Sequence, residues 1–217
     1  MVRILYAHWK QMPTADVLMS SLPANWKVTA FARYGKRASD AARAGWTGLL
    51  LLHAAGVEGD LRYAESGRPY LTDAAVDFNF SHTEKLTVCA ISTSQTASAK
   101  EDLLVGIDAE SGARIDPERV MQIAKRWFSA EELRILSGMR DPSTFLQIWT
   151  RKEALIKRSG EGLKGLREAD TVSLAKNLKL YSFWIEDTVS AVCAHRDADI
   201  EKPVCMDEEL LALFASK

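Results

Sequence analysis

Residues 149–157 have the sequence Trp-Thr-Arg-Lys-Glu-Ala-Leu-Ile-Lys, and this stretch predicts the central helix of the chain. Apolar residues such as Trp149 and Ile156 supply one side of it. Glu153 and Lys157 stand four residues apart, so their side chains share one face. A carboxylate and an ammonium held one turn apart can serve a metal-bound phosphate, with Glu153 as ligand or base and Lys157 as phosphate contact. An ordinary surface ion pair explains the same spacing.

Composition limits the class of protein. A chain of 217 residues is long enough for one compact unit or two small lobes, and its 47% hydrophobic content is typical of a globular protein. The net charge of -1 gives no general basic footprint for nucleic acid, so an anionic ligand must be held by local cations. The longest apolar stretch, residues 48–55, is too short to span a membrane. We expect no membrane or nucleic-acid partner.

The three cysteines are odd in number and fit no zinc spacing. Cys89 and Cys193 lie in apolar, strand-like runs, which indicates buried thiols. This favours a reducing, cytoplasmic setting, and the first six residues are too short an apolar run for a signal peptide.

Apolar periodicity and helix caps predict an α+β chain. Asp116-Pro117 is a strong helix start, and Ser129 with Glu132 forms a capping box. The predicted helices cover residues 13–22, 38–55, 116–128, 129–137, 141–160 and 207–215. The predicted strands cover residues 2–7, 27–31, 78–82, 86–91, 103–110, 171–174, 179–185 and 189–195, with a loop at 93–100.

A faint internal repeat suggests two halves. Val88-Cys89-Ala90 recurs half a chain later as Val192-Cys193-Ala194, and a tryptophan lies in each of the two long helices. Chance could produce this pattern. If it is real, it predicts two similar lobes, residues 1–100 and 101–217, with a cleft between them.

Asp108 and Glu110 lie at the end of a predicted strand, where a period of two puts both side chains on one face. Adjacent carboxylates repel unless a cation lies between them, and such hard oxygen ligands suit Mg²⁺. Gly106 just before them allows close approach of backbone or ligand. Glu153 could add a third carboxylate. Exposed acids at a strand end are the alternative.

Several cations could hold a phosphate. Arg33, Lys36, Arg37 and Arg43 lead into a predicted helix, whose first amides also attract anions, although a solvated helix face explains them equally well. His82 could donate to a phosphate or pack against its neighbours. The sequence has neither a P-loop nor a Gly-x-Gly-x-x-Gly motif, which excludes P-loop NTPases and typical Rossmann enzymes.

Taken in order, these motifs resemble the 4'-phosphopantetheinyl transferases, in particular their larger, two-lobed, Sfp-like type. The resemblance covers residues 30–195, and its last two motifs are the diagnostic pair. The motifs are Gly67-Arg68-Pro69, residues 78–82, residues 106–110, and Phe128-Ser129 with Glu132 followed by residues 149–157.

The resemblance implies an α+β fold of two lobes related by a pseudo-twofold axis, each a long helix packed on an antiparallel sheet. It implies that coenzyme A and Mg²⁺, or Mn²⁺, bind between the lobes. A serine of an acyl or peptidyl carrier protein would attack the β-phosphate, take up 4'-phosphopantetheine and release 3',5'-ADP. The enzyme would be a holo-[acyl-carrier-protein] synthase, with its carrier unspecified. The two-lobed length suggests that a single chain makes its own cleft, so we expect a monomer.

The resemblance also implies residue roles. Asp108, Glu110 and Glu153 would be metal ligands, Glu153 also the base, and Lys157 the pyrophosphate contact. The other implied coenzyme A contacts are Arg37, Arg43, Arg68, Ser81 and His82. The pair of cations that the family often has before its first long helix is not clearly present here.

Two alternatives remain at this point. A coenzyme A- or carrier-binding module without transfer activity would not need the three carboxylates that this chain has. A metal-dependent phosphohydrolase of small pyrophosphates normally needs more carboxylates or histidines. Residues 125–128, Lys-Arg-Trp-Phe, are candidates for carrier docking or for the core.

Overall fold

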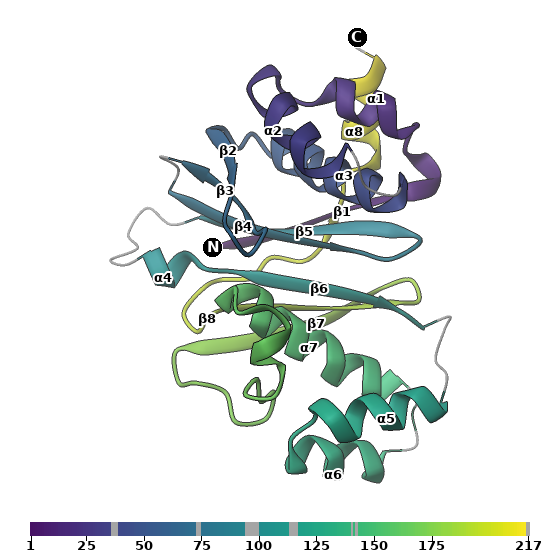
Figure 1. Cartoon of the computed structure of the whole chain (residues 1–217), viewed down its shortest axis with the longest axis vertical. Helices are drawn as coiled ribbons and strands as arrows, with labels where there is room; N and C mark the ends of the chain where they lie inside the picture. Colours follow the sequence, from purple (N-terminus) through teal and green to yellow (C-terminus); the bar gives the residue numbers. More distant parts are fainter. Residues whose placement is uncertain are drawn as a thin grey trace.

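The computed structural model describes residues 1–35, 39–72, 75–93, 100–112, 117–139, 141 and 143–215. Two sheets lie face to face, and helices cover the outer side of each (Figure 1). The first helical layer contains α1 (Ala15–Ser21), α2 (Ala24–Tyr34), α3 (Ser39–Ala54) and α8 (Asp207–Ala215). The second contains α5 (Pro117–Trp127), α6 (Ala130–Gly138) and α7 (Ser143–Ser159), and the short helices are η1 (Trp9–Gln11), α4 (Lys100–Leu103) and η3 (Gly162–Leu166). The predicted α+β class is confirmed.

The two large sheets share one arrangement: β5 lies between β4 and β1 in the first, and β8 lies between β7 and β6 in the second. The first sheet has the order β4-β5-β1-β9 and the second the order β6-β8-β7. Their strands are β1 (Val2–His8), β4 (Val76–His82), β5 (Leu86–Thr93), β9 (Val204–Cys205), β6 (Gly106–Ser111), β7 (Leu178–Ile185) and β8 (Thr188–His195), while β2 (Asp60–Tyr63) and β3 (Pro69–Thr72) form a separate pair. All pairs are antiparallel except β1 with β9.

The repeated Val-Cys-Ala peptide lies in an inner strand of each large sheet. Cys89 of β5 is opposite Leu5 and Phe80, and Cys193 of β8 is opposite Gly106 and Leu180. Both cysteines are fully buried. The repeat therefore marks strands that are covered on both sides, and the predicted pseudo-twofold relation stays a prediction.

The core between the sheets follows from alternation along the strands. In β1, Val2 and Ile4 pack with Ile107 and Val192 across the two sheets. Leu5, which follows Ile4 and points to the opposite face of the strand, belongs to the cluster beneath α1, α2 and α3. Each face of the first sheet thus buries apolar side chains, one against helices and one against the second sheet.

Helix α7 packs closely on β6 because β6 begins with glycine. A Cβ atom on Gly106 would lie 2.5 Å from the amide nitrogen of Arg158 and closer still to the carbonyl oxygen of Ala154. The sequence-based expectation of a close approach at Gly106 is confirmed. This contact fixes the distance between the carboxylates of β6 and the charged side chains of α7.

A buried ion pair anchors α7 to α6. Glu132 makes both hydrogen bonds of the capping box with Ser129. The same carboxylate accepts from Lys152 Nζ at 2.9 Å and from the amide and hydroxyl of Thr171, each at 2.8 Å. Glu132 and Lys152 are both fully buried. One glutamate therefore serves as helix cap, ion-pair partner and loop anchor.

Two predicted strands are wrong. Residues 27–31 belong to helix α2, whose buried residues Trp26, Ala30 and Tyr34 recur every four residues. Its β-favouring Val28 is 79% exposed, so the propensity of that side chain was misleading. Residues 171–173 form bends and residue 174 is irregular, because the Thr171 amide bonds the Glu132 carboxylate instead of a neighbouring strand.

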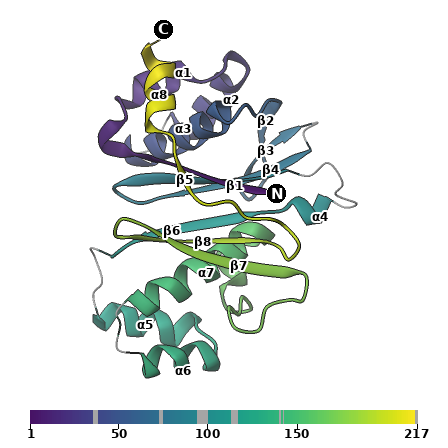
Figure 2. The ribbon, with the colours of Figure 1, turned by 180° about the vertical axis from the view of Figure 1, so that it is seen from behind.

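The division into residues 1–100 and 101–217 stays a prediction. The last part of the chain, however, packs on the first sheet and its helices. The chain returns to the first sheet at its end, where β9 pairs with β1 and α8 packs on α1 and α3 (Figure 2). The predicted loop at 93–100 lies largely outside the described residues. Within the described part of the chain, every helix is too short or too polar to cross a membrane.

Candidate active site

Three elements distant in sequence meet where the two sheets adjoin. Lys157 of α7 donates to Asp108 Oδ1 of β6 at 2.6 Å and to Ser81 Oγ of β4 at 2.8 Å. Ser81 in turn donates to Asp108 Oδ1 at 2.9 Å, and both Ser81 and Asp108 are buried. The sequence-predicted residues Ser81, Asp108 and Lys157 thus form one hydrogen-bonded triangle.

The second oxygen of Asp108 is buried and has no hydrogen-bond partner among the described residues. Buried carboxylate oxygens are nearly always satisfied by a donor or a cation. The orientation of Asp108 therefore leaves one strong acceptor for a bound cation or its water.

Glu110 and Glu153 complete an acidic cluster beside Asp108. Burial, followed by the negative charge of Asp108, raises the pKa of each of these two glutamates to about 7. Lys157 opposes both shifts, and Trp149 Nε1 donates to Glu110 Oε1 at 3.2 Å. Three carboxylates against one ammonium make a site that favours added positive charge.

The donor set fits a hard divalent cation such as Mg²⁺, which prefers carboxylate oxygens and water. The orphaned oxygen of Asp108 supports this fit. In the described structure, however, no choice of one oxygen each from Asp108, Glu110 and Glu153 brings all three oxygens within 4.8 Å of one another. Binding of an ion by all three would therefore require side-chain rotation.

Two cavities flank the acidic cluster. One of about 630 Å³ is lined in part by apolar residues, among them Val120, Phe145 and Trp149. The other, of about 420 Å³, is lined by Arg33 and Lys157, among others. Both cavities contain His82, Glu110 and Glu153 in their walls, so the carboxylates lie between two possible ligand compartments.

His82 reaches both cavities but is a weak cation. Its ring stacks on Trp9, with centroids 5.8 Å apart and planes inclined by 10°. Desolvation, followed by the nearby Lys157 ammonium, lowers the pKa of His82 below its ordinary value. At neutral pH His82 is therefore an uncharged hydrogen-bonding group.

The other predicted coenzyme A contacts are engaged elsewhere. Arg68 forms an ion pair with Asp77 at 2.6 Å and donates to the carbonyl oxygens of Val105 and Lys157. This position joins β4 to β6 and α7, and the predicted contact of Arg68 with coenzyme A stays a prediction.

Arg43 is likewise occupied. It donates to the carbonyl oxygens of Trp9 and Met12 at 2.6 and 2.7 Å, and its guanidinium lies over the Trp9 ring. It holds the turn after β1 rather than pointing at the acidic cluster. Arg37 lies outside the described residues, and its predicted role stays a prediction.

The sequence did not predict several residues that line the site. Trp149 was expected to be a core residue, yet it bonds Glu110 and lines the larger cavity. Arg119 and Trp9 also line that cavity. No sequence signal marked Trp9, since its place depends on how β1 enters the first sheet. Arg33 lines the smaller cavity, but of the basic cluster only Arg37 and Arg43 were predicted as coenzyme A contacts.

Residues 125–128 were candidates for carrier docking or for the core. Phe128 is buried in the hydrophobic cluster between α5 and α7. Trp127 is only partly buried, and the guanidinium groups of Arg126 and Arg167 lie over its ring at 4.8 and 5.8 Å. The two neighbours therefore divide into one core residue and one partly exposed aromatic residue with basic companions.

Residues 104–209 match the sequence model of the 4'-phosphopantetheinyl transferase superfamily. This match covers β6, α7 and the hairpin of β7 and β8, and it contains Asp108, Glu110, Glu153 and Lys157.

The chain is also similar to individual proteins of this kind. It is 28% identical over 152 residues to the 4'-phosphopantetheinyl transferase gsp of Aneurinibacillus migulanus, covering 69% of this chain and 53% of that protein. It is 33% identical over 110 residues to the 4'-phosphopantetheinyl transferase Sfp of Bacillus subtilis, covering 48% and 43%. It is 30% identical over 116 residues to the 4'-phosphopantetheinyl transferase HetI of a Nostoc species, covering 50% and 44%. The chain thus spans about half the length of the curated relatives it matches.

Proposed function

We propose that the chain transfers 4'-phosphopantetheine from coenzyme A to a serine of a carrier protein, because residues 104–209 match the sequence model of the 4'-phosphopantetheinyl transferase superfamily. The observation that carries the proposal is the meeting of Asp108 and Lys157 with Glu110 and Glu153 between two cavities. Phosphoryl transfer depends mainly on positioning and charge neutralisation, and this arrangement can supply both.

In this proposal Asp108, Glu110 and Glu153 hold a divalent cation, Mg²⁺ or Mn²⁺. The bound cation would neutralise the pyrophosphate of coenzyme A. Lys157 lies within hydrogen-bonding distance of Asp108 and Ser81, at the same edge of the smaller cavity. Its ammonium can contact a phosphate oxygen there and share the same neutralising task.

Glu153 serves as the general base. Its carboxylate lies in the walls of both cavities, where it can accept the proton of a bound serine directly or through water. The serine oxygen bonds to the β-phosphorus of coenzyme A while its proton passes to Glu153. The bond from that phosphorus to the bridging oxygen breaks, and 3',5'-ADP leaves with the bridging oxygen.

The two cavities suggest where the substrate parts bind. The smaller cavity has the cations Arg33 and Lys157 in its wall and suits the phosphates. The larger cavity combines apolar side chains with Arg119 and suits the pantetheine arm and the approaching serine. Trp127 at the end of α5, with Arg126 and Arg167 over its ring, is a candidate docking surface for an acidic carrier.

The proposal includes a monomeric, cytoplasmic enzyme. Support for a monomer comes from the site itself, because β4, β6 and α7 of a single chain supply the three carboxylates together with Ser81 and Lys157. The carrier can be an acyl or a peptidyl carrier protein.

A transfer assay tests the proposal. The protein is incubated with coenzyme A, Mg²⁺ and several apo carrier proteins, and each carrier is measured by intact mass. We expect serine-linked phosphopantetheine on at least one carrier. Coenzyme A binding without modification of any carrier would instead support a binding module, and 3',5'-ADP release without a carrier would support a phosphohydrolase.

A further inference from the structure

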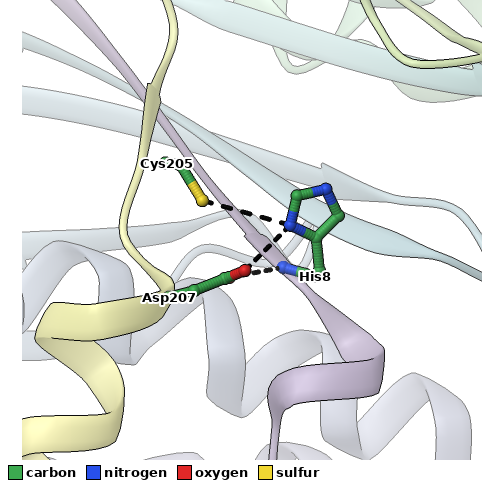
Figure 3. A group of neighbouring side chains, drawn as sticks. All are labelled: His8, Cys205 and Asp207. Atoms are coloured by element: carbon green, nitrogen blue, oxygen red, sulfur yellow. Dashed lines mark hydrogen bonds and ion pairs between the residues drawn. The ribbon is translucent and has the colours of Figure 1, made fainter.

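A second group of ligand-type side chains lies where the end of β1 meets β9 and the start of α8. His8 ends β1, Cys205 lies in β9, and Asp207 begins α8 (Figure 3). The His8 Nδ1 atom is 2.9 Å from Asp207 Oδ2 and 4.0 Å from Cys205 Sγ. One atom from each residue lies within 4.8 Å of the others. This group shares no residue with the acidic cluster or with its two cavities.

We propose that His8, Cys205 and Asp207 bind a transition-metal ion of the Zn²⁺ type. An imidazole, a thiolate and a carboxylate are the three ligand types that zinc uses in proteins. Magnesium and calcium, in contrast, prefer oxygen alone. The mixed set therefore separates this site chemically from the all-carboxylate cluster.

The observed spacing is close to that of a tetrahedral centre. Zinc bond lengths of about 2.0 Å to nitrogen and oxygen and about 2.3 Å to sulfur place nitrogen and oxygen ~3.3 Å apart and nitrogen and sulfur ~3.5 Å apart. The corresponding separations here are 2.9 and 4.0 Å. Both differ from the tetrahedral values by about half an ångström, which small side-chain rotations can supply.

The opposite nitrogen of the histidine supports this assignment. In Figure 3 the ring directs one nitrogen at Cys205 and Asp207 and the other away from them. That second atom, Nε2, is buried, lacks a hydrogen-bond partner among the described residues, and lies 3.6 Å from Glu186 Oε1. Metal-bound histidines usually direct their free N–H group at a carboxylate, which fixes the ring orientation.

The site is also accessible from solvent. A hollow of about 530 Å³ is lined by Cys205 and Asp207 together with Gln11, Glu208 and Glu209. It gives an ion a path to the site and leaves room for water or a further carboxylate as fourth ligand.

The thiol can be identified unambiguously. Cys205 is exposed, whereas Cys89 and Cys193 are buried in the inner strands of the sheets. Burial raises the pKa of these two buried thiols to about 12 and about 11, so they remain protonated and inert. A metal–thiolate signal can therefore be assigned to Cys205.

Binding here would connect β1 with the segment that follows the second sheet. Because the three residues lie almost at opposite ends of the chain, a bound ion closes a loop of nearly the whole sequence. Closing so long a loop restricts the unfolded chain strongly. The expected consequence is a higher midpoint of thermal unfolding in the presence of Zn²⁺.

Cobalt substitution tests the proposal on the full chain. The protein is freed of metal with a chelator, kept reduced and titrated with Co²⁺, whose bond to a thiolate gives a charge-transfer absorption band. We expect a band that saturates at one Co²⁺ per chain and is removed by equimolar Zn²⁺. Absence of the band in the wild-type protein would overturn the proposal.

Matched variants identify the ligands. C205S should lose the band, whereas D207N and H8Q should weaken Co²⁺ binding at least tenfold while each keeps a hydrogen-bonding side chain. D108A should keep the band, because it alters only the acidic cluster. A band that persists in C205S, or undiminished binding in both D207N and H8Q, would show that these residues are not the ligands. Circular dichroism checks that each variant is folded.

Discussion

Lys157 is positioned to balance the charge of the acidic cluster. Its ammonium donates to Asp108 and Ser81, while Glu110 and Glu153 lie close enough to be affected by its charge. The spacing of Glu153 and Lys157 on one helix suggested this role. The bond to Ser81 could not be predicted, because it depends on how β4 meets α7.

Replacing Lys157 with alanine should weaken coenzyme A binding. A hydrogen bond to a charged group contributes about 1.5–3 kcal/mol, so we expect the KM for coenzyme A to rise roughly 10- to 100-fold. Steady-state kinetics at saturating carrier measures this. Lys85→Ala is the matched control, since Lys85 pairs with the exposed Asp187 and should leave the KM unchanged. An unchanged KM in Lys157→Ala would contradict the assigned contact.

Glu153 should make the metal-free protein less stable as pH rises. Its pKa is raised from 4.5 to about 7, so the folded protein keeps a proton that the unfolded chain has already lost in this range. Stability therefore falls between about pH 4.5 and pH 7. Glu153→Gln should lessen the fall and be more stable than wild type above about pH 8, by on the order of 1–3 kcal/mol.

Urea unfolding at several pH values in the presence of a chelator measures this effect. Glu168→Gln, which changes an exposed glutamate, should follow the wild-type curve. Equal pH dependence in Glu153→Gln and wild type would show that burial does not raise the pKa of Glu153.

At the scale of elements, capped helices were predictable and short strands were not. The capping box of α6 and the apolar side of α7 are local signals, and the structure has both helices. Strand identity depends on distant partners. Residues 27–31 have the composition of a strand but the buried spacing of a helix, and the two residues of β9 form a strand only because β1 lies beside them.

Gly106→Ala should separate α7 from β6. The new Cβ atom would lie 2.5 Å from the Arg158 amide nitrogen, so backbone must move, and overpacking of this kind costs about 1–3 kcal/mol or more. Thermal or urea unfolding measures the loss. Gly138→Ala is the control, because an added Cβ atom there has no neighbour within 4 Å. Equal stability of the two variants would contradict the close approach.

At the scale of the whole molecule, Arg68 joins the two sheets. Its guanidinium contacts Asp77 of β4, the Val105 carbonyl oxygen before β6, and the Lys157 carbonyl oxygen of α7. Asp77 also accepts from the Val105 amide. The Gly-Arg-Pro motif was noticed in the sequence as a ligand contact. Its bridging position could not be inferred, because the sequence does not show which faces of the sheets meet.

Arg68→Ala should therefore destabilise the molecule as well as the site. It leaves the Asp77 carboxylate buried without its cation, which typically costs about 3–5 kcal/mol. Urea unfolding measures the effect, with Arg134→Ala as control because Arg134 pairs with Glu131 on the surface. A stability loss no larger than that of Arg134→Ala would indicate that Arg68 is not a bridge between the sheets.

Transfer activity of the Asp108→Ala variant tests the central claim most directly. The variant and the wild-type protein are compared for serine-linked phosphopantetheine on an apo carrier, by intact mass, over a range of Mg²⁺ concentrations. We expect Mg²⁺-dependent modification with the wild-type protein, and a loss of at least a thousandfold in rate with a folded Asp108→Ala, equivalent to about 4 kcal/mol. A folded Asp108→Ala variant that modifies the carrier at the wild-type rate would contradict the assignment of this cluster as the catalytic centre.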